Sequence, residues 1–320
     1  MAIQTVLGPI EQEELGFCHS HEHLFLADGI PALLNPALRI DDLERTMQEL
    51  RMYKQVGGRS IVDAQPLGCG RMEMQLVEAA ARTDIHILAS TGFHKLAFYP
   101  SDHWIYRYDE AALADIFVHE LTVGMYTGTD REEPGSFIDE KAGLIKTAID
   151  EERAGDRDKR WFRAAARAAL ETGAPLMCHT ELCEQGVQLA AYYRNQGIPA
   201  NQIIICHLDR KLDRLDIHKQ LAEQGIYLEY DTIGRFKYHS DEEEAVLIKE
   251  MVDSGYEDLI LLGLDSTRQR LRSYGGDIGL DHLSVRFLPL LRKFGISDSA
   301  IHKMMIDNPA QAFDNKRQRK

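Results

Sequence analysis

The chain has 320 residues, 44% hydrophobic and 28% charged, which is enough to bury a large core in one large domain or two smaller ones. Its formal net charge of -14 argues against nucleic-acid binding, which requires a basic face. The sequence lacks the basic start and apolar run of a signal peptide and any membrane-spanning run of about 20 apolar residues. Its five cysteines are odd in number and scattered, which favours reduced thiols. We therefore expect a cytoplasmic protein with no membrane partner.

Predicted strands and helices alternate along the whole chain. Short apolar runs typical of buried parallel strands occur at 16–24, 60–64, 85–90, 143–148, 175–179, 202–207, 226–231 and 259–265. Helices are predicted at about 41–50, 71–82, 109–124, 161–172, 183–196, up to Gly225, and at about 241–254, 280–293 and 297–306. A doubly wound sheet uses the same alternation, but a count of eight strands favours a closed barrel. With no linker in sight, we predict one α/β domain over residues 1–320, a (β/α)8 TIM barrel.

Three histidines, His19, His21 and His23, occupy every second position of the first predicted strand. Side chains at i and i+2 of a strand share a face, so the spacing aims all three imidazoles the same way. Imidazoles that point together are common metal ligands. A solvated strand edge or a satisfied core pair produces the same pattern. The spacing also leaves open which two of the three would bind a metal.

The apolar strands repeatedly end in a residue that is able to bind metal. These residues are His21, His23, Lys146, His179, His207 and Asp265. In α/β barrels the active site forms at the carboxyl ends of the strands, so residues far apart in sequence converge on one rim. A single polar residue at a strand end is commonly a satisfied core or loop residue. Their recurrence on one rim instead predicts a functional site.

Lys146 requires a separate explanation, because an ammonium group beside metal cations would be both repelled and desolvated. A surface lysine or a lysine paired with a carboxylate is the simplest alternative. The functional alternative is reaction with carbon dioxide to form a carbamate, an anionic ligand that can bridge two metals.

With these residues, the chain resembles the phosphotriesterase-related family of the amidohydrolase superfamily over nearly its whole length. The matching motifs are His21-Glu22-His23, residues 142–146 ending in Lys146, residues 172–175 leading to His179-Thr180, Cys206-His207, Asp265, and Asn308-Pro309 with Phe313. The resemblance implies two divalent metal ions per chain, commonly zinc, with manganese or cobalt as alternatives. It places His21, His23 and Asp265 on one metal, His179 and His207 on the other, and Lys146 as a bridging N6-carboxylysine. His19 then becomes a strand residue deeper in the barrel.

The implied chemistry is hydrolysis of an ester bond. Two cations about 3.5–4 Å apart lower the pKa of a bridging water and supply hydroxide at neutral pH. One metal polarises the carbonyl or phosphoryl oxygen under attack. Asp265 is the candidate catalytic residue that takes the hydroxide proton and hands it to the leaving group.

The loops after the seventh and eighth strands point to a phosphorylated substrate. They hold five cationic residues in an otherwise acidic protein, namely Arg235, Lys237, Arg268, Arg270 and Arg272. Positive charge beside the metals suits a phosphate group, whereas salt bridges to Asp277, Asp281 or residues 242–244 are the plain alternative. Relatives that hydrolyse phosphorylated sugar lactones are similar here, and the resemblance assigns their phosphate contacts to Lys237 and Arg268, with Tyr274 third.

His94 follows the third strand, where many relatives that hydrolyse quorum lactones or organophosphates have a tyrosine. This departure favours a polar substrate, and His94 with Lys95 could contact sugar hydroxyls or lie on a loop surface. We predict a lactonase that opens a pentono-1,4-lactone phosphate, a small-molecule substrate. The alternatives are a phosphotriesterase, a carboxylesterase or a lactonase for unphosphorylated rings, and a catalytically silent barrel that binds a metal or ligand. Homodimerisation is left open.

Overall fold

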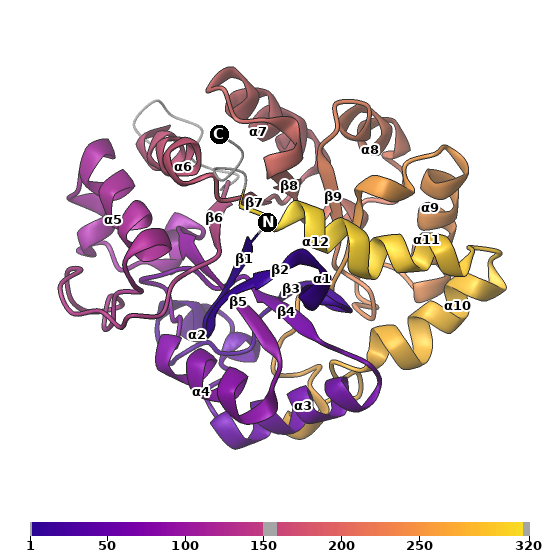
Figure 1. The fold of residues 1–320 in the computed structure, drawn as a ribbon, viewed down its shortest axis with the longest axis horizontal. Coiled ribbons are helices and arrows are strands. Elements are labelled where there is room, and N and C mark those ends of the chain that lie inside the picture. The colour runs from indigo at the N-terminus through magenta and orange to yellow at the C-terminus, as the bar shows by residue number, and fades with distance from the viewer. Residues whose placement is uncertain (1, 150–158, 316–320) are drawn as a thin grey trace.

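The computed structural model describes residues 2–149 and 159–315, in which eight parallel strands form one sheet (Figure 1). The strands are β3 (Cys18–Glu22), β4 (Ser60–Asp63), β5 (His86–Gly92), β6 (Leu144–Ala148), β7 (Leu176–His179), β8 (Ile203–Ile205), β9 (Tyr227–Tyr230) and β10 (Ile260–Leu262). Each strand pairs in parallel with the next one in sequence. Their short lengths and almost entirely buried residues agree with the apolar runs seen in the sequence.

Contacts between the first and last strands close this sheet into a barrel. The Ser20 hydroxyl donates to the carbonyl oxygen of Leu262 at 2.8 Å, and the Asp265 N–H donates to the carbonyl oxygen of His21 at 3.0 Å. In Figure 1 the strands lie at the centre of the molecule and the helices surround them. The predicted (β/α)8 TIM barrel is thereby confirmed.

The outer helices follow the strands in the predicted order. They are α3 (Leu43–Gln55), α4 (Glu73–Thr83), α5 (Glu110–Thr122), α6 (Lys159–Thr172), α7 (Cys183–Asn195), α8 (Leu215–Ala222), α9 (Asp241–Asp253) and α10 (Leu288–Lys293). A capping box fixes the start of α9, because the Ser240 hydroxyl accepts the Glu243 N–H and the Glu243 carboxylate accepts the Ser240 N–H. The predicted helix at 297–306 is instead α11 (Asp298–His302), the π-helical segment η10 (Lys303–Asp307) and α12 (Asn308–Ala312).

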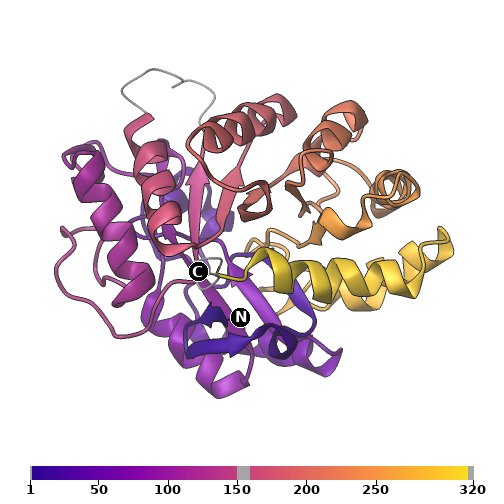
Figure 2. The same cartoon turned by 45° about the horizontal axis from the view of Figure 1, so that its top comes forward.

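The sequence pattern missed a small N-terminal unit that covers one end of the barrel. The strands β1 (Ala2–Thr5) and β2 (Gly8–Glu11) form an antiparallel hairpin, and the short helix α1 (Gln12–Leu15) follows it. Figures 1 and 2 show the hairpin together with α12 in front of the strand ring. Ile3, Leu15 and Phe313 pack there against the inward-facing strand side chains. The Val6 N–H bonds to Ile87, near the start of β5, so this unit closes the amino end and leaves the carboxyl end open.

A bulge in β3 overturns the expectation that His19, His21 and His23 share one face. The pairing of β3 with β4 shifts register between His19 and Glu22. His19 packs against Tyr53 of α3 with 4.5 Å between ring centroids, so it lies outside the barrel wall and not deeper inside it. The prediction was wrong because one extra residue in a strand flips the facing of every side chain beyond it.

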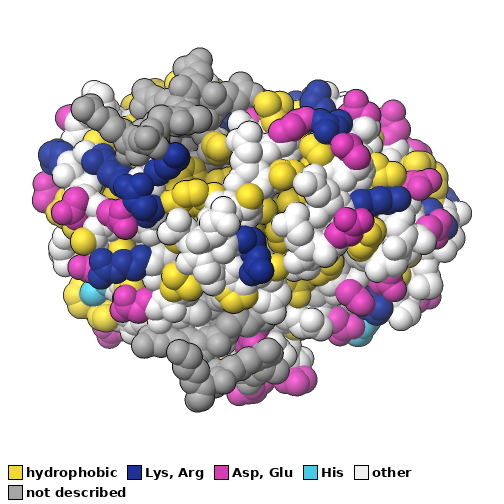
Figure 3. Space-filling model, turned by 90° about the horizontal axis from the view of Figure 1, so that it is seen from above, with side chains coloured by type: hydrophobic (Ala, Val, Ile, Leu, Met, Phe, Trp, Pro, Cys, Tyr) yellow, Lys and Arg dark blue, Asp and Glu magenta, His cyan; other side chains and the backbone are white. Residues whose placement is uncertain are grey.

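The outer helices present a mixed surface. On the side at the top of Figure 1, acidic and basic side chains are interspersed with hydrophobic ones (Figure 3). Within residues 2–149 and 159–315, none of the helices combines the length and apolar character needed to cross a bilayer.

A second small helix that the sequence pattern did not predict, α2 (Ile30–Leu34), lies in the loop after β3, at the open carboxyl end of the barrel.

Candidate metal centre

Five of the barrel strands or the loops directly after them bring the six predicted ligands together at the carboxyl end. These residues are His21, His23, Lys146, His179, His207 and Asp265, and all six are buried. Lys146 Nζ lies 3.2 Å from His21 Nε2, and His23 Nε2 lies 3.3 Å from Asp265 Oδ1. His207 Nε2 lies 2.7 Å from His179 Nδ1. Side chains that are up to 244 positions apart in sequence therefore meet in one cluster.

The cluster contains two overlapping groups of donor atoms. His21, His23 and Asp265 offer one nitrogen or oxygen each, and these atoms all lie within 4.8 Å of one another. The same holds for His207, Asp231 and Asp265. Asp265 belongs to both groups, so its carboxylate lies between the two sets of donor atoms. The donors are imidazole nitrogens and carboxylate oxygens, which suit zinc and similar divalent cations.

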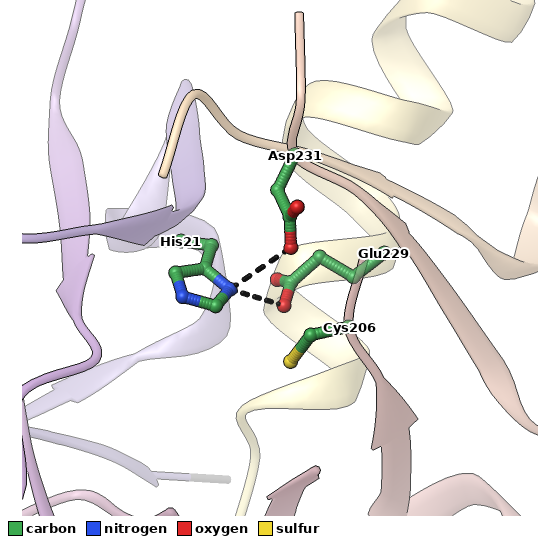
Figure 4. Close-up of side chains that lie close together, drawn as sticks. All are labelled: His21, Cys206, Glu229 and Asp231. Carbon is green, nitrogen blue, oxygen red and sulfur yellow. Dashed lines mark hydrogen bonds and ion pairs between the residues drawn. The ribbon is translucent and has the colours of Figure 1, made fainter. Parts of the chain in front are cut away.

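Carboxylates behind two of the histidines fix the orientation of their rings, as Figure 4 shows for His21. His21 Nδ1 lies 2.8 Å from Glu229 Oε2 and 3.1 Å from Asp231 Oδ2. His207 Nδ1 likewise lies 2.6 Å from Asp231 Oδ1. Protons on these Nδ1 atoms leave the Nε2 lone pairs facing the cluster, as in many metal sites. Sequence reasoning assigned Glu229 and Asp231 no role, although an acidic residue inside an apolar strand was a usable signal.

Burial disfavours the protonated form of three of the histidines, and a neighbouring arginine favours the ionised form of Asp265. Burial lowers the pKa of His21, and it lowers the pKa values of His179 and His207 well below the usual value. Burial alone would raise the pKa of Asp265, but the Arg235 guanidinium 2.8 Å away and the nearby histidines hold it well below its usual range. Neutral imidazoles beside an ionised carboxylate are the protonation states that bind a divalent cation.

Lys146 lies in surroundings that are poorly suited to an ammonium group. It is completely buried, and its Nζ has His21 Nε2 at 3.2 Å and the Cys206 sulfur at 3.8 Å as neighbours. Among residues 2–149 and 159–315, no carboxylate forms an ion pair with it. An unpaired buried charge costs several kcal/mol, so this position is unfavourable for a lysine side chain that keeps its charge without a partner.

The backbone at two candidate ligands adopts a conformation that non-glycine residues rarely use. His207 has φ 63° and Asp265 has φ 46°, both in the left-handed region. Such conformations cost of order 1–3 kcal/mol and persist where the surrounding structure holds them, commonly at functional sites. Both residues lie just after strands, where the chain must turn sharply to aim a side chain into the cluster.

A cavity of about 530 Å³ opens over this cluster. His23, His179, His207 and Asp265 form its floor, and its walls carry the cations Lys95, Arg210, Arg235, Lys237 and Arg270. Most of these cations are already engaged: Arg235 pairs with Asp265, while Arg210 and Lys95 both pair with Glu181. Lys237 is exposed, and its Nζ lies 4.6 Å from the Tyr238 ring centroid without an ion pair in the described part of the chain.

The predicted substrate contacts divide into two sets. Arg235, Lys237 and His94 line the cavity, and the His94 ring lies 5.1 Å from the His179 ring. Arg268 and Tyr274 do not line it. The Arg268 guanidinium stacks 5.3 Å from the Tyr274 ring centroid, and the Tyr274 hydroxyl lies 2.9 Å from Thr46 Oγ1.

Two ion pairs near the cavity were not among the predicted substrate contacts or differ from the prediction. Arg272 pairs with Asp281 at 2.6 Å, which is the salt bridging considered as the alternative to phosphate binding. Arg210 and its partner Glu181 both line the cavity, and the sequence analysis did not predict this. Their signal was a charged residue shortly after a strand that ends in a candidate ligand.

The fold and this cluster define a TIM barrel with a candidate binuclear metal centre at the carboxyl ends of its strands. The profile of the phosphotriesterase family matches residues 1–313, and the chain belongs to this family. It is 31% identical to a phospho-furanose lactonase of Mycoplasmopsis synoviae, over 98% of this chain and 92% of that protein.

Solved structures agree with this assignment. A lactonase from Listeria monocytogenes superposes with a TM-score of 0.90 at 26% identity, covering 99% of this chain and 100% of the other. The phosphotriesterase homology protein of Escherichia coli, solved with phosphate in its active site, has a TM-score of 0.84 at 27% identity and covers 94% and 99%.

Proposed function

We propose that this protein is a metal-dependent lactonase that opens phosphorylated sugar lactones of the pentono-1,4-lactone phosphate type. The relative from Mycoplasmopsis synoviae is a phospho-furanose lactonase, and the similar Listeria monocytogenes structure is a lactonase. The observation that carries the proposal is the position of Lys237 on the wall of a cavity whose floor holds the candidate ligands. Lys237 forms no ion pair with a carboxylate of residues 2–149 and 159–315.

His21, His23 and Asp265 would hold one divalent cation, and His179 and His207 the other, with Lys146 between them as N6-carboxylysine. Zinc fits the nitrogen and oxygen donors, and manganese and cobalt are the alternatives. When bound, such cations supply a nucleophile at neutral pH and polarise a carbonyl oxygen. Asp265 acts as the proton acceptor in this scheme, because Arg235 keeps its carboxylate ionised beside the floor of the cavity. It then returns the proton to the alkoxide released by ring opening.

The phosphate contact falls to Lys237, with Arg235 as a second cation nearer the floor. Phosphate is recognised by charge-assisted hydrogen bonds, and a lysine that is free of carboxylates can give all its donors to the ligand. The Escherichia coli relative holds phosphate in its active site, which supports a phosphate-bearing substrate. His94 faces the same space from the opposite wall and is proposed to contact a sugar hydroxyl. We do not propose a phosphate contact for Arg268 or Tyr274, because neither residue lines the cavity.

The test compares kcat/KM of the metal-replete enzyme on phosphorylated and unphosphorylated forms of the same lactone. Lys237→Ala should lower kcat/KM about 10- to 100-fold on the phosphorylated lactone, the equivalent of one charged hydrogen bond, and leave the unphosphorylated one unchanged. Arg268→Ala is the matched control and should retain the phosphate preference. If Lys237→Ala also retains it, the phosphate assignment is wrong.

A wider panel separates the remaining alternatives. Turnover of neutral aryl esters or phosphotriesters above that of lactones would indicate a carboxylesterase or phosphotriesterase. Stoichiometric metal without turnover of any ester would indicate a silent binding barrel. We also propose a single-domain cytoplasmic enzyme, which the five buried, free cysteines support. Homodimerisation stays a prediction, and light scattering of the purified protein decides it.

A further inference from the structure

A third group of buried polar side chains lies beside the loop that carries Arg235 and Lys237. Its members are Asp209 in the short helical turn after β8, His239 at the end of the β9–α9 loop, and Glu244 in α9. Each offers a nitrogen or oxygen atom, and the three atoms lie within 4.8 Å of one another. None of the three belongs to the ligand set proposed for the binuclear centre.

The carboxylates of this group have fewer partners than buried oxygens normally require. Asp209 is completely buried and accepts the Thr232 N–H on Oδ2, at 2.5 Å, but its Oδ1 has no hydrogen-bond partner among the residues that the structure describes. Glu244 is also completely buried, and its Oε1 has no partner. His239 Nε2 lies 3.0 Å from Glu244 Oε2 and 2.9 Å from Thr232 Oγ1. Buried carboxylate oxygens without donors are strongly disfavoured unless a cation or proton is present.

The surrounding charges do not supply the missing compensation. No lysine or arginine of residues 2–149 and 159–315 forms an ion pair with Asp209 or Glu244. His282 lies nearby but pairs with Asp241 at 2.8 Å. Burial raises the pKa of Glu244 to about 8, with repulsion from Asp209 adding to the effect. If both carboxylates were ionised, a protonated His239 would still leave the group with one net negative charge.

We propose that Asp209, His239 and Glu244 hold one divalent cation of the zinc class, separate from the binuclear centre. One neutral imidazole and two carboxylates form a donor set that such cations bind, and the bound site has no net charge. The cation links the segment after β8, the β9–α9 loop and helix α9, which carry the three residues. Since this loop carries Arg235 and Lys237, the site fixes the cavity wall that faces the substrate.

The experiment measures the metal content of the full-length protein by mass spectrometry after gel filtration in metal-free buffer. Glu244→Gln should contain one equivalent less zinc per chain than the wild type. Glu242→Gln, which removes an exposed carboxylate of the same helix, is the matched control and should lose none. An equal zinc content in Glu244→Gln and wild type overturns the proposal.

A second measurement does not depend on the folding of a variant. Crystals of the zinc-replete wild type, measured at the zinc absorption edge, should show an anomalous peak among Asp209, His239 and Glu244. Density at the binuclear centre without such a peak overturns the third site and leaves the lactonase proposal standing. A peak at the third site in a protein that opens no lactone would support the third site and overturn the lactonase proposal. The two proposals can therefore fail independently.

Discussion

His21 and Glu229 form a buried pair in which His21 Nδ1 lies 2.8 Å from Glu229 Oε2. The pair joins the first strand of the barrel to β9, and it turns His21 Nε2 toward Lys146, 3.2 Å away. The charge of Glu229 favours a proton on Nδ1, so the lone pair stays on the nitrogen that faces the cluster. A residue outside the predicted ligand set therefore controls the state of a residue inside it.

Replacing Glu229 should weaken metal binding without removing a ligand. We expect Glu229→Gln to lower metal affinity about 10- to 100-fold, because glutamine keeps the shape but withdraws the charge that makes His21 a stronger donor. Competition with a chromophoric chelator measures this affinity. Glu250→Gln, an exposed change in α9, is the control. Unchanged affinity in Glu229→Gln would show that the carboxylate only fills space.

Carboxylation of Lys146 can be observed directly. Protein loaded with metal in ¹³C-labelled bicarbonate should show one carbamate resonance by NMR. Lys146→Met should lack this resonance and should bind less metal, since methionine fills the buried position without offering an anionic oxygen ligand. A wild-type spectrum without the resonance, in protein that retains its metal, would contradict the proposed modification.

The stability of the fold should fall in mild acid because of His218. Burial lowers the pKa of His218 to about 4, compared with 6.5 for an ordinary histidine. Between these values the unfolded chain binds a proton that the folded chain does not, so the free energy of unfolding decreases as pH falls through this window. The contribution amounts to about 3 kcal/mol at its lower end.

Denaturant unfolding at about pH 7 and about pH 4.5 measures this effect by comparing wild type with His218→Gln. The glutamine can replace the 3.0 Å hydrogen bond between His218 Nδ1 and the Tyr230 hydroxyl, but it does not titrate. The variant should lose less stability than wild type between the two pH values. Equal losses would show that other groups account for the acid sensitivity.

The buried ion pair of Arg71 and Glu120 should respond asymmetrically to mutation. Arg71 Nη2 lies 2.6 Å and Nη1 lies 2.8 Å from the two Glu120 oxygens, and both side chains are buried. Arg71→Met should destabilise the protein by roughly 3–5 kcal/mol because it leaves the Glu120 charge unpaired. The double variant with Glu120→Leu should recover part of that loss in denaturant unfolding. A double variant that is less stable than Arg71→Met would contradict this explanation.

Local pattern predicted the barrel well because each strand is buried on both faces. The runs at 175–179 and 202–207 matched β7 and β8 to within two residues, since a strand covered by helices on one side and core on the other must be apolar throughout. The N-terminal hairpin was missed because its four-residue strands are half exposed and too short to show a period. The bulge in β3 was missed because an extra residue leaves no trace in the alternation of residue types.

The chain's residue order by itself determined the strand count, the carboxyl-end placement of His21, His23, Lys146, His179, His207 and Asp265, and the excess of cations in two loops. Only the tertiary structure decided which of those cations reach the cavity. Arg268 and Lys237 occupy equivalent positions in the linear pattern, yet one stacks on Tyr274 and the other lines the cavity. Strand ends converge because a closed barrel forces them to, whereas the direction of a loop side chain depends on neighbours that sequence spacing does not specify.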